Sequence, residues 1–439
     1  MIYGSDTEFP GGVAMVVNPL EVMMDRGCVE WCSHPEELSR LFDDEMVTGY
    51  IGFDPTADSL HVGHLIPMMG LAWMQRFGHR PIAIAGMGTG LIGDPSGKSR
   101  ERNLLTLEQV GKNLVTVKQQ LGQFLDFDCG DNSALIVNNY DWLGKQTLLE
   151  FLRDTGKHFS VNYMIGREYV KSRLDDPEKT ISYTEFSYML LQAFDFCHLF
   201  ENFACKLQMG GNDQQGNIIA GIDLIRKKTG GQAFGITYPL LLSASGQKFG
   251  KTEGGTVWLS PERTSPYKFY QFWMNTDDRD LEKLLKLFTF LPLDDIRGTM
   301  EEHASRPERR QGQRRLAMEV TSMVHGDQAA RAAERASAIL FGDGFEPSEL
   351  TPEMLDILMN EVPSGTFTDA AKLSVSDVLA EAGACASKSE ARRLILGGGV
   401  YLNGRRLEAS GEITDEDLLE GRHLFFRLGK KRFFAATKV

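Results

Sequence analysis

Apolar and polar positions follow two alternating patterns between residues 46 and 260. Short apolar or β-branched runs predict buried strands. They alternate with longer stretches in which apolar residues recur every three or four positions, as in amphipathic helices. We expect strands at 50–53, 81–87, 135–138 and 205–209, and helices at about 61–77, 106–125, 145–153, 184–200 and 214–228. This alternation predicts an α/β fold with a doubly wound, parallel, Rossmann-like sheet that binds ligands beyond the carboxyl ends of its strands.

The pattern changes along the rest of the chain, and the changes divide it into domains. Residues 1–45 are expected to form an N-terminal extension and a helical lead-in, followed by the α/β domain at 46–260. Residues 261–342 have an almost wholly helical pattern, and 343–371 read as a Pro-containing linker with one short helix at about 352–360. Residues 372–439 predict a small α+β domain, with two short helices, a strand at 400–402 before the turn Asn403-Gly404, and strands near 422–428 and 432–437.

Composition narrows the class of protein. The chain has 439 residues, 42% hydrophobic and 24% charged, which is ordinary for a multidomain globular enzyme, and no apolar run is long enough to span a membrane. The first 25 residues contain four acidic residues and no Lys or Arg, unlike a targeting peptide, and the six cysteines form no disulfide framework. We therefore expect a cytoplasmic protein without membrane contact. Because Cys28, Cys32 and His34 lack a second ligand pair at zinc spacing, we predict no metal site.

Charge is distributed unevenly along the chain. The formal net charge is −13, but residues 372–439 hold 12 Lys or Arg against 9 Asp or Glu, a net +3 that leaves −16 for everything before them. Phosphate binding depends on local rather than total charge. The last domain is therefore the part expected to contact a polyanion.

Two short segments carry the candidate chemistry. Residues 61–64 read HVGH, which places His61 and His64 on one helix face, with a glycine between them that lets a flat ring or a phosphate approach closely. Residues 248–252 read KFGKT, which places Lys248 and Lys251 on a Gly-containing loop. Each segment alone is more often structural, but imidazole and ammonium groups together on an α/β scaffold indicate a site for ATP phosphates.

A third segment, GDPSGKS at 93–99, invites a P-loop interpretation and therefore a kinase or GTPase. The P-loop spacing requires a glycine where this chain has Ile92, so that class is excluded. Lys98 and Arg102 are still expected to present positive charge to phosphates.

These groups suit attack by a carboxylate on the α-phosphorus of ATP, which gives a mixed anhydride and pyrophosphate. The nucleophile is already an anion and needs no general base, so catalysis depends on positioning and on neutralising the charge of the leaving pyrophosphate. ATP-bound Mg²⁺ is expected to assist. The donors that this reaction needs are His61, His64, Lys98, Arg102, Lys248 and Lys251.

The same segments resemble the signatures of a known family. Residues 55–64 are similar to the HIGH motif of class I aminoacyl-tRNA synthetases, and 248–252 to their KMSKS loop. Further segments resemble the bacterial-type tyrosyl-tRNA synthetases: YIGFD at 50–54, GLIGDPSG at 90–97, SYMLLQAFD at 187–195, QMGGNDQ at 208–214, and residues 264–278. The resemblance covers about 46–439. It implies a homodimeric ligase that activates L-tyrosine with ATP to tyrosyl-adenylate and pyrophosphate, then transfers tyrosine to the 3′-terminal ribose of tRNA(Tyr).

Carried over position by position, the resemblance implies a role for each matching residue of a catalytic nucleotide-binding domain at 46–260. Tyr50 and Asp195 would hydrogen-bond the substrate phenol, and the α-ammonium group would be held by Asp94, Tyr188 and Gln192. The ATP or adenylate would be lined by Gly52, Asp54, Thr56, His61, His64, Gly211, Asp213, Gln214 and Lys251. The catalytic set would be His61, His64, Lys98, Arg102, Lys248, Lys251 and Thr252. Gln215 departs from the family, which usually has tryptophan there, and this puts the packing beneath that strand end in doubt.

Spacing supports tyrosine as the substrate independently. The sheet and its helices take up the stretch between His64 and Lys248, so no editing domain is inserted and the amino acid must be selected in one step. An apolar pocket cannot do this for a small aliphatic side chain. Polar groups that pair a hydroxyl can reach about 10⁵-fold, a figure established on tyrosine against phenylalanine in this same family.

The tail at 387–394 and 399–404 resembles a small RNA-binding module shared with a ribosomal protein. Contacts to tRNA phosphates are then expected from Lys388, Arg392, Arg393, Arg405 and Arg406. We expect this module and the helical domain at 261–342 to hold the anticodon arm and the long variable arm.

Two alternatives stay open at this point. A nucleotidyltransferase that activates a phosphorylated small molecule would share the histidine motif, but it would not need the Tyr50 and Asp195 pair or the RNA-like tail. A non-catalytic RNA-binding relative would not need Lys248 and Lys251.

Overall fold

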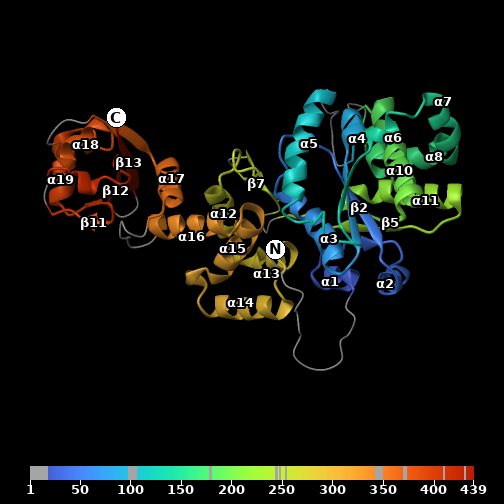
Figure 1. The fold of residues 1–439 in the computed structure, drawn as a ribbon, viewed down its shortest axis with the longest axis horizontal. Coiled ribbons are helices and arrows are strands. Elements are labelled where there is room, and N and C mark those ends of the chain that lie inside the picture. Colours follow the sequence, from blue (N-terminus) through green and yellow to red (C-terminus); the bar gives the residue numbers. More distant parts are fainter. Residues whose placement is uncertain are drawn as a thin grey trace. The chain divides into compact units, whose positions relative to one another are not determined.

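The structure is a computed structural model that describes residues 18–96, 106–176, 180–242, 246, 249–252, 255–341, 350–368, 373–408, 411–429 and 432–439. The chain divides into two compact units (Figure 1). The first comprises residues 1–256 and 282–293, and the second comprises 257–281 and 294–439. Each unit has its own sheet or helical core and is described by itself.

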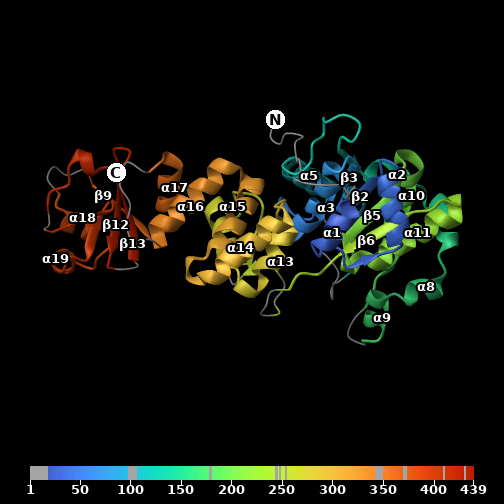
Figure 2. The same cartoon turned by 90° about the horizontal axis from the view of Figure 1, so that it is seen from below.

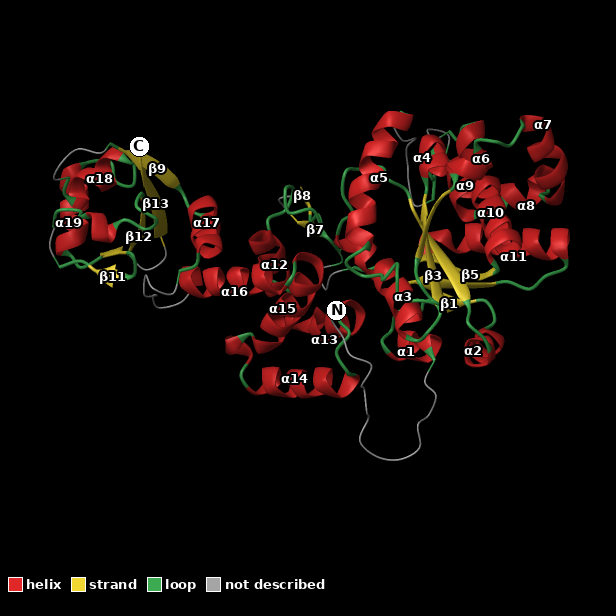
Figure 3. Ribbon diagram, in the orientation of Figure 1, coloured by secondary structure: helices red, strands yellow, loops and turns green. Residues whose placement is uncertain are grey.

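A sheet forms the centre of the first unit (Figure 3). Among the described residues it has six strands in the order β1-β6-β5-β2-β3-β4. All neighbouring strands are parallel except β1, which pairs antiparallel with β6. The chain leaves β2 for β3 on one side, while β5 lies on the other, so a topological switch point falls between β2 and β5. The strands are β1 (Trp31–Cys32), β2 (Thr48–Phe53), β3 (Arg80–Ala85), β4 (Leu135–Asn138), β5 (Cys205–Gly211) and β6 (Phe234–Tyr238).

Helices cover both faces of this sheet (Figure 2). A Cβ at Gly49 would meet the side chain of Met74 in α3 (Leu65–Arg76), whereas the next residue, Tyr50, packs edge-on against Phe196 of α10 (Tyr183–Phe203). Because successive strand residues point to opposite faces, α3 and α10 lie on opposite sides. The other helices of this layer system are α1 (Pro19–Asp25), α2 (Pro35–Asp44), α4 (Met87–Ile92), α5 (Leu107–Leu121) and α11 (Gln215–Thr229).

The α/β prediction is confirmed, with differences in detail. The four predicted strands are present, although β3 ends at Ala85 because the chain turns at Gly86 into α4. Strands β1 and β6 were not predicted. The single helix expected at 145–153 is wrong, because a capping box between Thr147 and Glu150 starts α7 (Leu148–Glu150) only at residue 148. The surrounding chain forms α6 (Tyr140–Leu143), a π-helical turn (Phe151–Thr155), a 3₁₀ turn (Gly156–His158), α8 (Val161–Ile165) and α9 (Glu168–Leu174).

The second unit begins with helices, as the sequence predicts, and ends in a small sheet. The helices are α12 (Pro266–Met274), the start of α13 (Asp278–Phe288), α14 (Leu293–Ser305), α15 (Gln311–His325), α16 (Asp327–Phe341) and α17 (Pro352–Glu361); residues 282–288 of α13 group with the first unit. The described strands follow the order β11-β10-β12-β13-β9, namely β9 (Ser364–Phe367), β10 (Val400–Leu402), β11 (Arg405–Arg406), β12 (His423–Leu428) and β13 (Arg432–Lys438).

Helices α18 (Val375–Glu381) and α19 (Lys388–Leu396) pack on that sheet through a core that includes Leu379, Ile395, Phe426 and Phe434. The predicted small α+β domain is confirmed. Strand β9, which lies inside the segment expected to be a linker, adds to the sheet by parallel pairing with β13. None of the helices in the described part of the chain has the length and hydrophobicity needed to span a bilayer.

Candidate active site

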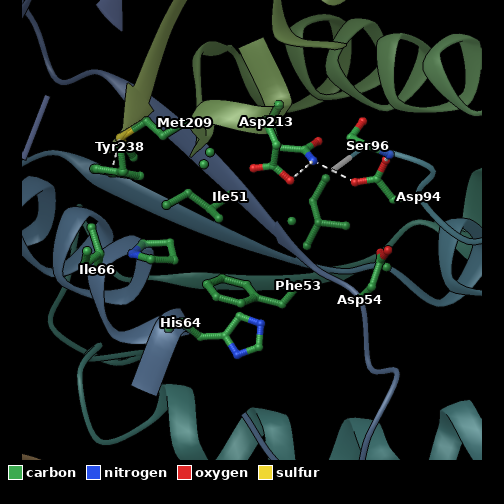
Figure 4. A pocket seen from close by; sticks show the side chains of 18 of the residues that line it. Ile51, Phe53, Asp54, His64, Ile66, Asp94, Ser96, Met209, Asp213 and Tyr238 are labelled. Carbon is green, nitrogen blue, oxygen red and sulfur yellow. Dashed lines mark hydrogen bonds between the residues drawn. The ribbon is translucent and has the colours of Figure 1, made fainter. Parts of the chain in front are cut away.

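A cavity of about 380 Å³ opens at the switch point, beyond the carboxyl ends of β2 and β5 (Figure 4). Its walls come from β2 and the turn after it, from α4 and the turn that follows, from α10, and from the end of β5. The predicted residues that line it are Tyr50, Gly52, Asp54, Thr56, His61, His64, Asp94, Tyr188, Gln192, Asp195, Gly211, Asp213 and Gln214. Segments far apart in sequence are therefore brought together at one site, as the motifs predict.

Not every predicted residue is placed. Lys98, Arg102 and Lys248 lie outside the described residues. Lys251 and Thr252 form the short strand β7, paired with β8 (Gly255–Thr256), and only their backbone is described. Their catalytic roles stay predictions.

The two histidines form a compact pair at the start of α3. His61 caps a 3₁₀ turn (Val62–His64), and its Nδ1 accepts a hydrogen bond from the Gly63 N–H at 3.1 Å. The Nδ1 of His64 accepts from the His61 N–H at 3.1 Å, and the two rings stack with centroids 3.9 Å apart. Because each Nδ1 is an acceptor, the proton of each neutral ring is on Nε2. Each ring therefore carries an Nε2–H donor of the kind that binds phosphate oxygens.

The inner end of the cavity holds Tyr50 and Asp195, both almost fully buried. The Tyr50 hydroxyl has no hydrogen-bond partner among the described residues, and neither has the buried Oε1 of Gln208 nearby on β5. The carboxylate of Asp195 accepts from Trp142 Nε1 at 2.6 Å and from Asn139 Nδ2 at 2.9 Å. An unpaired buried hydroxyl costs free energy unless a ligand pairs it, so this end of the cavity suits a polar group.

Burial also changes the acidity of this pair. Desolvation raises the pKa of Asp195 to about 7, against the opposing effect of its two hydrogen bonds. Burial, followed by the nearby Asp195 charge, raises the pKa of Tyr50 well above its usual value. Tyr50 is therefore a neutral hydroxyl at physiological pH, able to donate or accept a hydrogen bond.

A second polar network lines the wall nearer the opening, where Figure 4 shows Asp94 beside Ser96 and Asp213. Asp94 accepts from the Ser96 N–H at 2.9 Å and from Gln214 Nε2 at 2.6 Å. Burial raises the pKa of Asp94, while these hydrogen bonds oppose the shift. The carboxylate is thus held in a fixed orientation, as recognition of a cationic group requires.

Asp54 and Gln192 are held in the same way. The Tyr188 hydroxyl donates to Asp54 Oδ2 at 3.3 Å and Thr89 Oγ1 donates to Asp54 Oδ1 at 2.9 Å. Asn217 Nδ2 donates to Gln192 Oε1 at 3.0 Å. Among the described residues no three His, Cys, Asp or Glu side chains converge as they would to hold a metal ion.

Three residues that support this site, Asn139, Trp142 and Asn217, are not among those predicted from the sequence. Asn139 directly follows β4, at the carboxyl end of a parallel strand, so its position alone was a signal for a site residue. Asn217 lies one helical turn after Gln214 and shares its face of α11. Trp142 carries no such signal, because its contact with Asp195 depends on how α6 and α10 pack.

The predicted tRNA-binding residues belong to the second unit, and none of them is among the residues that line the cavity. Arg392 and Arg393 on α19, and Arg405 and Arg406 on β11, are exposed. Arg406 Nε donates to the Gly398 carbonyl at 3.0 Å, which ties β11 to the turn after α19. Lys388 instead forms an ion pair with Asp377 at 2.7 Å, so its charge is partly neutralised.

The chain is similar to proteins of one functional class over nearly its whole length. The family model "tRNA synthetases class I (W and Y)" matches residues 43–342, and "Tyrosine--tRNA ligase SYY-like C-terminal domain" matches 353–436. A tyrosine–tRNA ligase of Anaeromyxobacter dehalogenans (strain 2CP-1) is 49% identical over 96% of this chain and 99% of its own, and tyrosine–tRNA ligase 1 of Bacillus subtilis is 47% identical over 96% and 100%. A C-terminally truncated mitochondrial tyrosyl-tRNA synthetase of Aspergillus nidulans has a TM-score of 0.67 and 32% identity, covering 74% of this chain and 94% of that one.

Proposed function

The chain belongs to the class I tyrosyl-tRNA synthetase family and is a tyrosine–tRNA ligase, and from this we propose that the cavity at the β2–β5 switch point is its tyrosine and ATP site. The enzyme joins L-tyrosine and ATP to give tyrosyl-adenylate and pyrophosphate, then transfers the tyrosyl group to the 3′-terminal ribose of tRNA(Tyr). The unpaired Tyr50 hydroxyl beside Asp195 is the observation that carries the assignment of the cavity.

In this proposal the phenol of the substrate lies at the inner end of the cavity. Its hydroxyl pairs with Tyr50, whose own hydroxyl has no partner among the described residues. It also pairs with Asp195, whose carboxylate is held in place by Asn139 and Trp142. The α-ammonium group lies at the outer network of Asp94, Tyr188 and Gln192. Phenylalanine would leave the polar inner end unpaired, which is the penalty that permits selection in one step.

ATP lies across the opening of the cavity. Gly52, Asp54, Thr56, Gly211, Asp213 and Gln214 would line the adenylate. The tyrosine carboxylate attacks the α-phosphorus, a new C–O–P anhydride forms, and the bond from the α-phosphorus to the bridging oxygen of pyrophosphate breaks. The Nε2–H donors of His61 and His64, with Lys98, Arg102, Lys248, Lys251 and Thr252, would neutralise charge on the transferring and leaving phosphates. Mg²⁺ would enter with ATP and add to this neutralisation.

We further propose that the second unit holds tRNA. The exposed arginines of α19 and β11 form a cationic surface on the net-positive end of the chain, which suits a phosphate backbone. Lys388 is the weakest member of this set because Asp377 already pairs with it.

Homodimer formation is a separate proposal, supported by an apolar surface of the first unit. Between residues 148 and 183 large apolar side chains are exposed, and Figure 2 shows α8 and α9 of this stretch projecting from the body of the unit. Exposed apolar side chains that gather into one patch usually mark a protein interface. Its members are Leu148, Leu149, Leu152, Val161, Ile165, Leu174 and Tyr183.

A cytoplasmic location is proposed from the cysteines. All six are free thiols, and burial raises the pKa of Cys28 to about 12 and that of Cys197 to about 11. Protonated, unpaired thiols are typical of proteins from a reducing compartment.

Ligand binding to the full chain tests the two ends of the cavity separately. Tyrosine is compared by calorimetry with phenylalanine, which lacks the hydroxyl, and with 3-(4-hydroxyphenyl)propionate, which lacks the ammonium group. We expect both analogues to bind at least about 100-fold more weakly than tyrosine, since each leaves buried polar groups unpaired. Asp94→Asn should weaken tyrosine but not the propionate. Equal binding of tyrosine and either analogue would contradict the assignment.

A further inference from the structure

One contact links the lysine-bearing loop at 248–252 to α13, a helix that has no role in the proposed reaction. Phe249 lies between Lys248 and Lys251 in sequence and lines the cavity. Its N–H donates to the Leu241 carbonyl at 3.0 Å, and its ring stacks on Phe288, with centroids 5.5 Å apart and planes 19° from parallel. Phe288 is the last residue of α13 and belongs to the same compact unit as the loop.

The next residue of the loop touches the histidine segment. Gly250 has a φ of +82°, and a Cβ built there would lie 2.5 Å from Val62 Cγ2. The turn at 249–250 therefore rests directly on the segment that holds His61 and His64. Phe249 sets the position of this turn on one side, and the glycine allows its close approach on the other.

Phe288 is well suited to fix such a position because hydrogen bonds hold the backbone on both sides of it. The buried Arg26 donates Nη1 to the carbonyls of Lys286 and Thr289, each at 3.0 Å, and Nη2 to the carbonyl of Leu291. Bonds from one guanidinium to three carbonyls around the end of α13 hold that end rigidly.

Aromatic rings reinforce the same end of α13. The Arg26 guanidinium lies 4.6 Å from the centre of the Trp73 ring, and Trp73 packs edge-on against Phe290 at 4.9 Å. The guanidinium of Arg76 lies over the Phe290 ring, 4.4 Å from its centroid. Phe288 itself is only 1% exposed. The stack therefore joins a loop residue to a helix end that is firmly held in place.

We propose that Phe288 is a positioning residue for tyrosine activation: by stacking on Phe249 it holds the turn at 249–250 against the His61–His64 segment, and so keeps that turn beside the histidines that would meet the phosphates. This inference rests on the proposed function of the cavity and its loop. Phe288 does not line the cavity, so tyrosine recognition at Tyr50 and Asp195 does not depend on it.

Steady-state pyrophosphate exchange by the full-length Phe288→Leu variant tests the proposal. An aromatic pair of this kind is worth about threefold to tenfold in an equilibrium. We expect kcat to fall by that factor while the KM for tyrosine stays within twofold of the wild type. Phe249→Leu should give the same loss, and the double variant should lose little more than either single variant, because both changes remove one contact.

Phe42→Leu is the matched control. Phe42 is also buried, 4% exposed, and its ring packs on His79 at 4.7 Å, but it touches neither the loop nor the cavity. Its kcat should be unchanged at a comparable loss of thermal stability.

The outcomes are separable. A wild-type kcat in Phe288→Leu, additive effects in the double variant, or a parallel rise in the KM for tyrosine would overturn the inference. If Phe288→Leu does not fold, Phe249→Leu decides alone, and an unchanged kcat there overturns it. Absence of exchange by the wild-type protein would instead contradict the proposed function.

Discussion

In the proposed site, the hydroxyl of Tyr50 is the group on which the choice of substrate would most depend. It is buried at the inner end of the cavity with no partner among the described residues, while the carboxylate beside it is fixed by Asn139 and Trp142. Leaving such a hydroxyl unpaired costs about 1–3 kcal/mol. In the proposed site a substrate phenol would remove this cost and phenylalanine would not, so the unmet hydrogen bond of Tyr50 would contribute to selectivity for tyrosine.

Replacing Tyr50 by Phe should therefore separate binding from stability. We expect the KM for tyrosine in pyrophosphate exchange to rise about tenfold, the equivalent of one hydrogen bond of about 1.4 kcal/mol. The free energy of unfolding measured in urea should not fall, because no hydrogen bond of the ligand-free protein is lost.

Tyr163→Phe is the control for this variant. Its hydroxyl is also buried without a partner in the described part of the chain, but Tyr163 does not line the cavity. Its KM should equal that of the wild type. An unchanged KM for tyrosine in Tyr50→Phe would show that the substrate phenol does not bind at this end of the cavity.

The raised pKa of Asp195 predicts that tyrosine binding depends on pH. Burial raises its pKa to about 7, so in the ligand-free protein the carboxyl is mostly neutral below that pH and ionised above it. An ionised carboxylate is the stronger acceptor for the substrate hydroxyl, so binding should strengthen as pH rises. We expect the KM for tyrosine to be about tenfold higher at pH 6 than at pH 8, following the ionised fraction. In Asp195→Asn this inflection near pH 7 should vanish, and its persistence there would assign it to another group.

At the scale of elements, the sequence predicted the segments whose own apolar pattern is clear. Strands β2, β3 and β4 contain short apolar or β-branched runs, and in β5 apolar residues alternate with Lys206 and Gln208. Strand β6 (Phe234–Tyr238) has a similar character, with Phe, Ile, Thr and Tyr, but the glycine in its interior weakened the signal. Strand β1 has two residues and exists because it pairs with β6, so no local pattern reveals it.

The site was predictable to the same degree and for the same reason. Residues in contiguous motifs at strand ends, such as Asp54 and Asp213, were identified from the sequence and lie in the cavity. Trp142 was missed because its role comes from packing between α6 and α10, which spacing does not encode. The predicted tRNA-binding set is one lysine and four arginines. The four arginines are exposed, whereas Lys388 pairs with Asp377, a contact that only the fold reveals.

Two glycines of the lysine-bearing segment predict different effects of alanine. Both Gly246 and Gly250 have positive φ, +79° and +82°, so each substitution incurs backbone strain of about 1 kcal/mol. At Gly246 an added Cβ meets nothing within 4 Å, whereas at Gly250 it would lie 2.5 Å from Val62. We expect the kcat of pyrophosphate exchange in Gly250→Ala to be at least tenfold below that of Gly246→Ala, at similar KM for tyrosine. Equal rates would show that contact between the turn and the histidine segment is not needed.

At the scale of the molecule, the two reactions should be separable by truncation. Because β9 pairs with β13, the small sheet begins near residue 364, and a chain ending at residue 362 removes it without leaving an unpaired strand. We expect this truncated protein to keep pyrophosphate exchange within about twofold and to lose at least about 100-fold in charging of tRNA, since several phosphate contacts are removed together. Aminoacylation and exchange assays on one preparation measure both. Equal loss of the two activities would contradict the modular interpretation.

A single charge introduced into the proposed interface should separate the homodimer into monomers. Leu149 is 79% exposed within the apolar surface at 148–183, and Leu149→Glu would place a carboxylate in the interface, where it costs several kcal/mol. Sedimentation should show a dimer for the wild type and a monomer for the variant. Val115→Glu is the control, since Val115 is 59% exposed on α5 outside this surface. A variant that sediments like the wild type would place the interface elsewhere.

The central claim is that this cavity activates tyrosine and rejects phenylalanine in one step. Exchange of labelled pyrophosphate into ATP by the full chain, with each amino acid in turn, measures it most directly. The account predicts exchange with tyrosine and a kcat/KM for phenylalanine lower by a factor on the order of 10⁴ to 10⁵. Folded protein that shows no tyrosine-dependent exchange, or that uses phenylalanine equally well, would contradict it.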